Sequence, residues 1–170
     1  MLVLVVSDNH GDREVLVDLI EKYQGKVDGM FHCGDSELEA TDSVWNDFYV
    51  VRGNCDYDDA FPTTVVADIK KEKIFMTHGH LHEVKFTMNT LLLAAKEVGA
   101  GFAFFGHTHE LGVELVDDVL LLNPGSIRLP RGKYPIKTYA IVETTSEKIT
   151  VKYYDETHQL VSELTSEFKR

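Results

Sequence analysis

The sequence predicts an α/β (α+β) fold in which two packed β-sheets are flanked by helices. In the first half of the chain, strand-like apolar runs surround one helical pattern, which is typical of a parallel βαβ unit. In the second half, short apolar segments alternate with polar turns, which favours antiparallel strands. With 170 residues, of which 44% are hydrophobic, the chain is expected to form a single domain over residues 1–170.

The first half predicts a strand, a helix and two more strands. Leu2–Val6 is a continuous run rich in Val and Leu, as expected of a strand buried on both faces. Asp12 is a candidate N-cap for a helix that ends near Gly25. The apolar stripe of this helix consists of Val15, Leu16, Leu19, Ile20 and Tyr23. Gly29–Cys33 and Phe48–Val51 are the next predicted strands.

In the second half, Thr64–Ile69 and Lys73–Thr77 flank a charged turn and predict a hairpin or adjacent strands. A helix is expected over Thr87–Val98. Further strands are expected at Phe102–Phe105, Leu111–Val116, Val119–Leu122, Tyr139–Thr144 and Ile149–Tyr154. In residues 156–170, the spacing of Leu160, Leu164 and Phe168 fits the apolar stripe of a helix.

Charge and composition exclude several classes of protein. The 17 basic and 28 acidic residues give a net charge of -11, so a nucleic-acid backbone would repel the chain. Two cysteines, Cys33 and Cys55, argue against a disulfide framework. Leu2–Val6 is too short to span a membrane and lacks the features of a signal peptide. We therefore expect no membrane association and a cytoplasmic protein.

Polar clusters directly follow five predicted strands. They are Asp8-Asn9-His10, Gly34-Asp35, Gly53-Asn54-Cys55-Asp56, His78-Gly79-His80 and Gly106-His107-Thr108-His109. The carboxyl ends of strands form the ligand crevice of α/β sheets, so all five clusters are expected to converge. Each cluster alone is compatible with a solvated turn, whereas the ordered set of carboxylates, amide and imidazoles is typical of a metal site. The glycines permit a close approach of the backbone around a crowded centre.

The series D-x-H, G-D, G-N-x-D, H-G-H and G-H-x-H resembles the calcineurin-like metallophosphoesterase superfamily. The short length and the segments Asn54-Cys55-Asp56 and Asn123-Pro124-Gly125-Ser126 are similar to its small prokaryotic phosphodiesterase branch (YfcE-like). The resemblance implies a metallo-dependent phosphatase-like fold, which agrees with the strand pattern. It also implies a small oligomer such as a homodimer.

The same resemblance implies a centre for two divalent metals. Its ligands at the first metal would be Asp8, His10 and His109. Its ligands at the second metal would be Asn54, His78 and His107. Asp35 would bridge the two ions. Spacing alone does not divide the ligands in this way.

Ligand chemistry supports a hydrolytic centre. Two dications would bring four positive charges, and the ligand carboxylates of Asp8 and Asp35 bring two negative charges. The remaining charge of about +2 suits a hydroxide and a phosphoryl anion, and a metal pair roughly 3.5–4 Å apart lowers the pKa of a bridging water. Four imidazoles favour Mn²⁺, Fe²⁺, Co²⁺, Ni²⁺ or Zn²⁺ over Mg²⁺ or Ca²⁺, and Mn²⁺ is the expected metal.

The pattern departs from the superfamily beside Asn54. Many members carry a histidine directly after this asparagine, where it is thought to protonate the leaving group, but this chain has Cys55. A positive metal field would lower the pKa of a thiol from about 8.5, so Cys55 is a poor general acid. Besides Asn54, the expected catalytic residue is therefore His80, for which an exposed loop histidine is the competing interpretation. The departure favours leaving groups that need little protonation.

Three residues, Cys55, Asp56 and Arg128, are expected to support the ligands or to contact the substrate. Arg128 forms a basic cluster with Arg131 and Lys133, which is a candidate phosphate site or a solvated loop. His32 and Cys33 are expected to lie in the strand or behind the ligands.

Together these features predict a metal-dependent phosphoesterase for small substrates. Phosphodiester hydrolysis by a hydroxide that bridges two metals is the leading hypothesis. A phosphomonoesterase would share this chemistry, and the sequence does not separate the two. A non-catalytic scaffold similar to the retromer subunit of this fold is a third hypothesis. The presence of coordinating side chains at all seven positions disfavours it.

Overall fold

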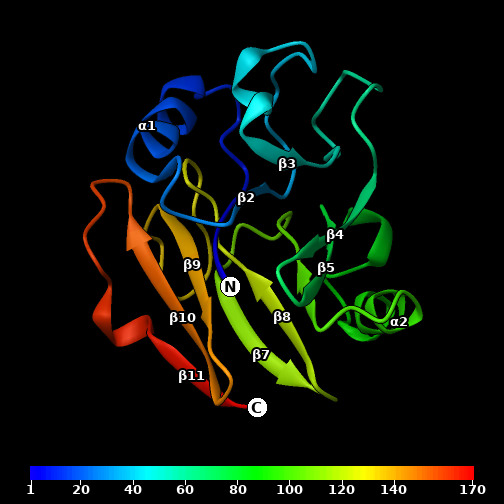
Figure 1. Cartoon of the computed structure of the whole chain (residues 1–170). Coiled ribbons are helices and arrows are strands. Elements are labelled where there is room, and N and C mark those ends of the chain that lie inside the picture. The colour runs from blue at the N-terminus through cyan, green and yellow to red at the C-terminus, as the bar shows by residue number, and fades with distance from the viewer.

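The computed structural model describes residues 1–170 and contains two mixed β-sheets with two α-helices outside them (Figure 1). The first sheet, in spatial order, consists of β11 (Ser166–Lys169), β10 (Lys148–Asp155), β9 (Thr138–Thr144), β1 (Leu2–Val6), β2 (Gly29–His32) and β3 (Phe48–Val50). The second sheet consists of β4 (Thr64–Ile69), β5 (Glu72–Thr77), β6 (Phe102–Phe104), β8 (Val119–Asn123) and β7 (Gly112–Val116). The helices are α1 (Arg13–Tyr23) and α2 (Asn89–Glu97), and neither is long and apolar enough to cross a membrane. The predicted two-sheet α/β fold is confirmed.

The first strand explains why its sequence is apolar without interruption. β1 pairs with β2 in parallel and with β9 in antiparallel orientation, so it lies inside the sheet. Val3 and Val5 join the cluster between the two sheets, whereas Leu4 and Val6 pack on the other face near α1. Successive side chains of a strand point to opposite faces, and here both faces are buried.

Parallel pairing places the carboxyl ends of several strands at common edges. In the first sheet β1, β2 and β3 run parallel, and in the second sheet β5, β6 and β8 run parallel. The five polar clusters follow β1, β2, β3, β5 and β6. The antiparallel β4–β5 hairpin and the β7–β8 hairpin complete the second sheet, as the sequence predicted.

The prediction of a helical stripe in residues 156–170 is wrong. The segment contains a short 3₁₀ helix, Ser162–Leu164, and then β11, which pairs antiparallel with β10. Phe168 and Leu164 pack against the core, but Leu160 is 45% exposed, so the three residues do not share one buried face. The open hydrogen-bonding edge of β10 determines this outcome, because it offers backbone partners that a helix would leave unpaired.

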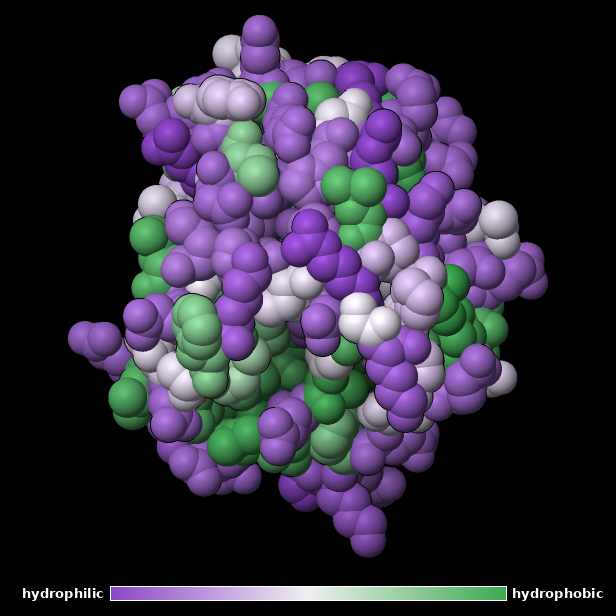
Figure 2. Space-filling model, turned by 180° about the vertical axis from the view of Figure 1, so that it is seen from behind, coloured by the Kyte–Doolittle hydropathy of each residue, from purple (hydrophilic) through white to green (hydrophobic).

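Most of the face shown in Figure 2 is hydrophilic, in agreement with the acidic composition. On the side turned away from the viewer in Figure 1, hydrophobic side chains gather in a hollow bordered by hydrophilic ones (Figure 2). Monomeric proteins seldom expose a large continuous apolar patch without a functional reason.

Candidate metal centre

The strand-end loops bring the seven predicted ligands together. Four of them have ligand atoms that all lie within 4.8 Å of one another: Asp8, His10, Asp35 and His109. Nε2 of His78 lies 3.3 Å from Asp35 Oδ2 and 3.2 Å from Asn54 Oδ1. The ring centroid of His107 lies 5.1 Å from that of His78. Two groups of potential ligands therefore meet at the carboxylate of Asp35.

Three histidines are oriented from outside the cluster through Nδ1. This atom donates to the Glu37 carboxylate in His10 (2.6 Å) and to the Leu129 carbonyl in His109 (2.8 Å). In His78 it donates to the backbone carbonyl that follows β2, at 2.7 Å. A neutral ring that donates from Nδ1 turns the lone pair of Nε2 the other way, which is how proteins orient metal-binding histidines. The three Nε2 atoms face the cluster.

This orientation turns electron pairs toward one another. Nε2 of His10 and Nε2 of His109 are 3.2 Å apart, and Nε2 of His109 is 3.2 Å from Asp8 Oδ1. Asp8 Oδ1 is buried and has no hydrogen-bond partner. Buried acceptors that face each other are costly unless a cation lies between them. The donor set therefore fits divalent metal ions.

The pKa shifts show the same excess of acceptors. Burial opposes protonation of His78 and His109, but the carboxylates of Asp35 and Asp8 outweigh it and raise both pKa values. The ring of His107 behaves differently, since burial, followed by repulsion from the His78 ring, lowers its pKa to about 4. His107 is therefore neutral at pH 7. A cluster that attracts protons in this way also attracts metal cations.

The backbone at the cluster is strained. Five predicted ligands have left-handed φ angles between 42° and 67°, namely Asp8, His10, Asp35, His107 and His109. Such angles are uncommon for residues other than glycine and are concentrated at functional sites. Two glycines allow the loops to pack closely against neighbouring side chains. A Cβ at Gly53 would collide with the Asp35 carboxylate, and one at Gly106 would collide with Ser7 Oγ.

Asp56 holds two of the ligand loops together. Its buried carboxylate accepts hydrogen bonds from the backbone N–H groups of Asp35 (2.9 Å), Glu37 (2.7 Å) and Gly53 (2.7 Å). It also accepts from Ser36 Oγ at 3.0 Å. One side chain thus joins the loop after β2 to the loop after β3. All four hydrogen bonds that its carboxylate accepts come from these two loops, so Asp56 supports the ligands from behind.

The Asn123-Pro124-Gly125-Ser126 segment supports the other ligand loops. Ser126 Oγ donates to the Asp8 carbonyl at 2.8 Å, and Asn123 Nδ2 donates to the Gly106 carbonyl at 2.9 Å. Asn123 Nδ2 also lies 3.0 Å from Thr108 Oγ1. The sequence identified this motif only through the family resemblance. The structure shows that it connects the loop after β1 with the loop after β6.

Cys55 and Arg128 are oriented by other contacts. The Cys55 N–H donates to Asp35 Oδ1 at 2.7 Å, while burial and then the nearby Asp35 carboxylate raise the pKa of its thiol to about 11. The protein's own groups therefore oppose the lowering that a metal field would cause. Arg128 is paired with Asp12 at the start of α1, at 3.4 Å.

Two histidines near the ligands differ in what holds them. His32 is buried, accepts from the Gly34 N–H at Nδ1 and donates from Nε2 to Asn9 Oδ1 at 2.8 Å, so it supports the loops as expected. His80 lies beside His78, with ring centroids 5.4 Å apart. Its buried Nδ1 has no hydrogen-bond partner.

Glu37 is a functional candidate that the sequence interpretation missed. Besides orienting His10, its carboxylate lies within 4.8 Å of the ligand atoms of His10 and Cys55. The spacing Asp35-Ser36-Glu37 repeats the spacing Asp8-Asn9-His10, with two coordinating residues separated by one. That repetition is the signal that would have identified it.

We predict that Asp56→Asn weakens Mn²⁺ binding about 10- to 100-fold, the usual effect of losing a group that orients ligands. The new amide NH₂ would face backbone N–H donors, which costs roughly 1–3 kcal/mol of stability. Isothermal titration calorimetry and thermal unfolding measure the two effects. Asp59→Asn, at an exposed position in the same loop, is the matched control. Equal Mn²⁺ affinity in both variants would contradict the role of Asp56.

Comparisons with known proteins agree with this geometry. A family model described as the calcineurin-like phosphoesterase superfamily domain matches residues 1–147. The chain is 40% identical over 164 residues to the probable metallophosphoesterase YsnB of Bacillus subtilis, and the match covers 96% of each chain. A crystal structure of a Streptococcus pneumoniae protein, described as a predicted phosphoesterase, superposes with a TM-score of 0.97 at 37% identity, covering 99% of this chain and 97% of that one.

A third relative is phosphodiesterase YfcE of Escherichia coli. It is 31% identical over 105 residues, which cover 57% of this chain and 53% of that relative. The resemblance carried by the five polar clusters is thereby confirmed, and the Asp and His residues of those clusters form a candidate metal site. The chain belongs to the calcineurin-like phosphoesterase superfamily, in its small YsnB- and YfcE-like branch.

Proposed function

We propose that the chain hydrolyses phosphodiesters with the help of two divalent metal ions. The observation that carries the proposal is the position of Asp35. Its carboxylate lies within reach of Asp8, His10 and His109 on one side and of His78 on the other. A carboxylate shared by two sets of ligands is what a two-metal site requires. The proposed ligands are Asp8, His10, Asp35, Asn54, His78, His107 and His109.

When bound, the metal pair would supply Lewis acidity and an activated water. The chain's own part is to hold the imidazole Nε2 atoms and the buried carboxylates in position. Four imidazoles beside two carboxylates favour a borderline-soft ion, and Mn²⁺ is the metal we propose. Asn54 contributes its amide oxygen, because its Nδ2 is turned toward Cys55 Sγ at 3.2 Å.

Local charge favours diesters over monoesters. Two dications would bring four positive charges, and Asp8, Asp35, the adjacent Glu37 and a hydroxide at the ions would bring four negative charges. Such a site has no positive charge in excess, so it accepts a phosphodiester, which carries one negative charge, more readily than a monoester dianion. The name of the YfcE relative, a phosphodiesterase, points the same way. A phosphomonoesterase and a non-catalytic scaffold remain the alternatives.

His80 is the proposed donor of a proton to the leaving group. Its ring lies beside those of His78 and His107, with centroid distances of 5.4 Å and 6.1 Å, and the three rings form a triangle because His78 and His107 are 5.1 Å apart. Its Nδ1 is buried and makes no hydrogen bond within the protein, so no other group fixes the orientation of this ring through that atom. Cys55 is less suited to this role, since burial and then the Asp35 carboxylate raise the pKa of its thiol to about 11, which makes it a weak proton donor.

We predict that the chelated protein is inactive and that added Mn²⁺ restores hydrolysis of bis(4-nitrophenyl) phosphate, with slower turnover of 4-nitrophenyl phosphate. His107→Ala removes one of the proposed ligands and should abolish both Mn²⁺ retention and turnover. His82→Ala, a nearby histidine outside the ligand set, is the control and should retain both. Elemental analysis and release of nitrophenolate provide the readouts.

Two outcomes would decide against this function. Absence of bound metal together with no turnover of either ester would favour the scaffold. Faster turnover of the monoester than of the diester would favour the phosphomonoesterase. Full activity in His107→Ala would reject that ligand assignment.

We further predict that His80→Ala slows hydrolysis of alkyl diesters about 10²- to 10⁴-fold, the usual contribution of general acid catalysis. The same substitution should slow hydrolysis of 4-nitrophenyl diesters much less, because nitrophenolate leaves without protonation. The measurement compares kcat for methyl 4-nitrophenyl phosphate and dimethyl phosphate in wild type, His80→Ala and His82→Ala. Equal losses for both leaving groups would reject His80 as the proton donor.

A further inference from the structure

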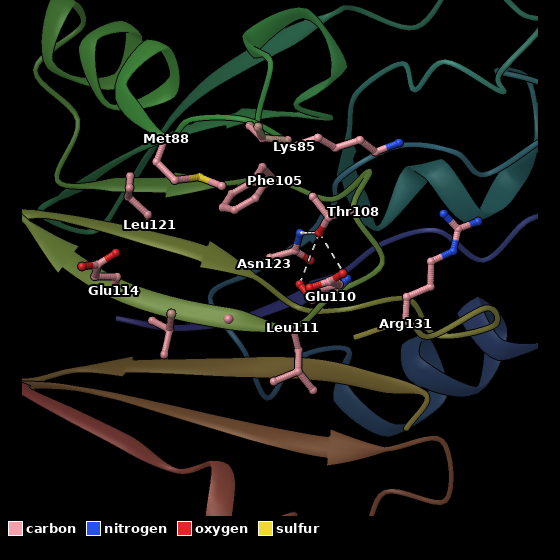
Figure 3. Close-up of a pocket in the computed structure, with 13 residues that line it drawn as sticks. Lys85, Met88, Phe105, Thr108, Glu110, Leu111, Glu114, Leu121, Asn123 and Arg131 are labelled. Carbon is pink, nitrogen blue, oxygen red and sulfur yellow. Dashed lines mark hydrogen bonds between the residues drawn. The ribbon is translucent and has the colours of Figure 1, made fainter. Parts of the chain in front are cut away.

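A groove of about 550 Å³ lies beside the candidate metal centre, between β7, β8 and the segment that leads into α2 (Figure 3). This volume is within the range of small-molecule sites. Helix α2 packs against β6 and β8 of the same sheet, and the groove continues from there toward β7. The groove is continuous with the loop that carries His107 and His109, because Thr108 between them lines it.

One end of the groove is apolar. Met88, Phe105 and Leu121 lie together there (Figure 3). In the antiparallel β7–β8 pair, Gly112 lies opposite Asn123 and Glu114 lies opposite Leu121. Directly opposed residues of an antiparallel pair point to the same face, so Gly112 lies on the face that lines the groove.

The other end is basic and lies next to the ligands. The Arg131 N–H donates to the His109 carbonyl at 2.9 Å, and Lys85 lines the groove on the side of Thr108 (Figure 3). The charged ends of Lys85 and Arg131 extend past Thr108, away from Leu121 (Figure 3). Neither side chain forms an ion pair or a hydrogen bond within the chain, although the net charge of the chain is -11.

An acidic side chain limits what the apolar end accepts. Glu114 lines the groove there on the same face as Leu121, whereas Glu110 lies beside Thr108 at the other end, where its N–H donates to Thr108 Oγ1 at 3.1 Å (Figure 3). A second anionic group would be repelled there, whereas an uncharged ring would be buried against Phe105 and Met88. The groove thus pairs an apolar pocket with cations at its metal end, which complements a singly charged phosphodiester with an apolar ester group.

We propose that this groove binds one ester group of the substrate, an uncharged aromatic or similarly apolar group, while Lys85 and Arg131 contact the phosphate. This inference rests on the proposed function and specifies its substrate class, phosphodiesters of apolar ring-containing alcohols. The sequence offered Arg128, Arg131 and Lys133 together as a candidate phosphate site or a solvated loop. The ion pair between Arg128 and Asp12 leaves Arg131 as the unpaired arginine beside the ligands.

The experiment compares binding of diphenyl phosphate and dimethyl phosphate to the Mn²⁺-loaded protein by isothermal titration calorimetry. Both are singly charged diesters, and they differ in the apolar area that the groove would bury. Gly112→Trp should place an indole ring in the groove, since a Cβ at Gly112 meets nothing within 4 Å and its φ is not left-handed. Gly101→Trp is the matched control, because its Cβ is equally unobstructed and it lies outside the groove.

Wild type and Gly101→Trp should bind diphenyl phosphate at least about tenfold more tightly than dimethyl phosphate, as expected for burial of a phenyl ring. Gly112→Trp should lose this preference. Replacing both Lys85 and Arg131 by Ser should weaken binding of both diesters by a similar factor. Equal affinity of wild type for the two diesters, or an unchanged preference in Gly112→Trp, would overturn the proposal.

These outcomes are distinguishable from failure of the proposed function. If the protein binds diphenyl phosphate selectively but hydrolyses no ester, the binding role of the groove is supported and the proposed phosphodiesterase function is rejected. If the protein hydrolyses bis(4-nitrophenyl) phosphate but has equal affinity for the two diester probes, the phosphodiesterase function is supported and the binding role of the groove is rejected.

Discussion

Buried oxygen and nitrogen acceptors that face one another repel, and around Asp8 and Asp35 the fold brings such atoms together. Nε2 of His10 and of His109 are 3.2 Å apart beside an Asp8 oxygen that has no hydrogen-bond partner. The unliganded cluster relieves this repulsion by favouring protonated rings at His78 and His109, which explains why their pKa values are raised. Two divalent cations would relieve it more completely, and the proposed hydrolysis would depend on those ions.

The rest of the fold can be understood as the framework that holds these acceptors in place. Parallel pairing in both sheets brings the strand-end loops together, and the Asp56 carboxylate and the Asn123–Ser126 segment then connect the loops to one another. Left-handed φ angles at five of the proposed ligands persist because several hydrogen bonds fix each loop. The positions of the ligands therefore depend on hydrogen bonds to the backbone of their loops, which residues other than the ligands provide.

Sequence patterns predicted the parts that depend on local chemistry. Strand periodicity located nearly all of the strands, and the strand-end rule brought Asp8, Asp35 and His78 to one place before any geometry was known. The patterns failed where pairing with another part of the chain determines the local conformation. At β11, the chain forms a strand because it pairs with the open edge of β10. Glu37 illustrates the same limit, because its role arises from a contact with His10, in a loop that the linear sequence does not connect to it.

Anomalous X-ray diffraction from crystals soaked in Mn²⁺ tests the two-metal centre most directly. We predict two anomalous peaks roughly 3.5–4 Å apart, the usual separation in two-metal sites, with the Asp35 carboxylate contacting both ions. Asp8, His10 and His109 should surround one peak, and Asn54, His78 and His107 the other. A single peak, or a peak held only by His10, Glu37 and Cys55, would contradict it.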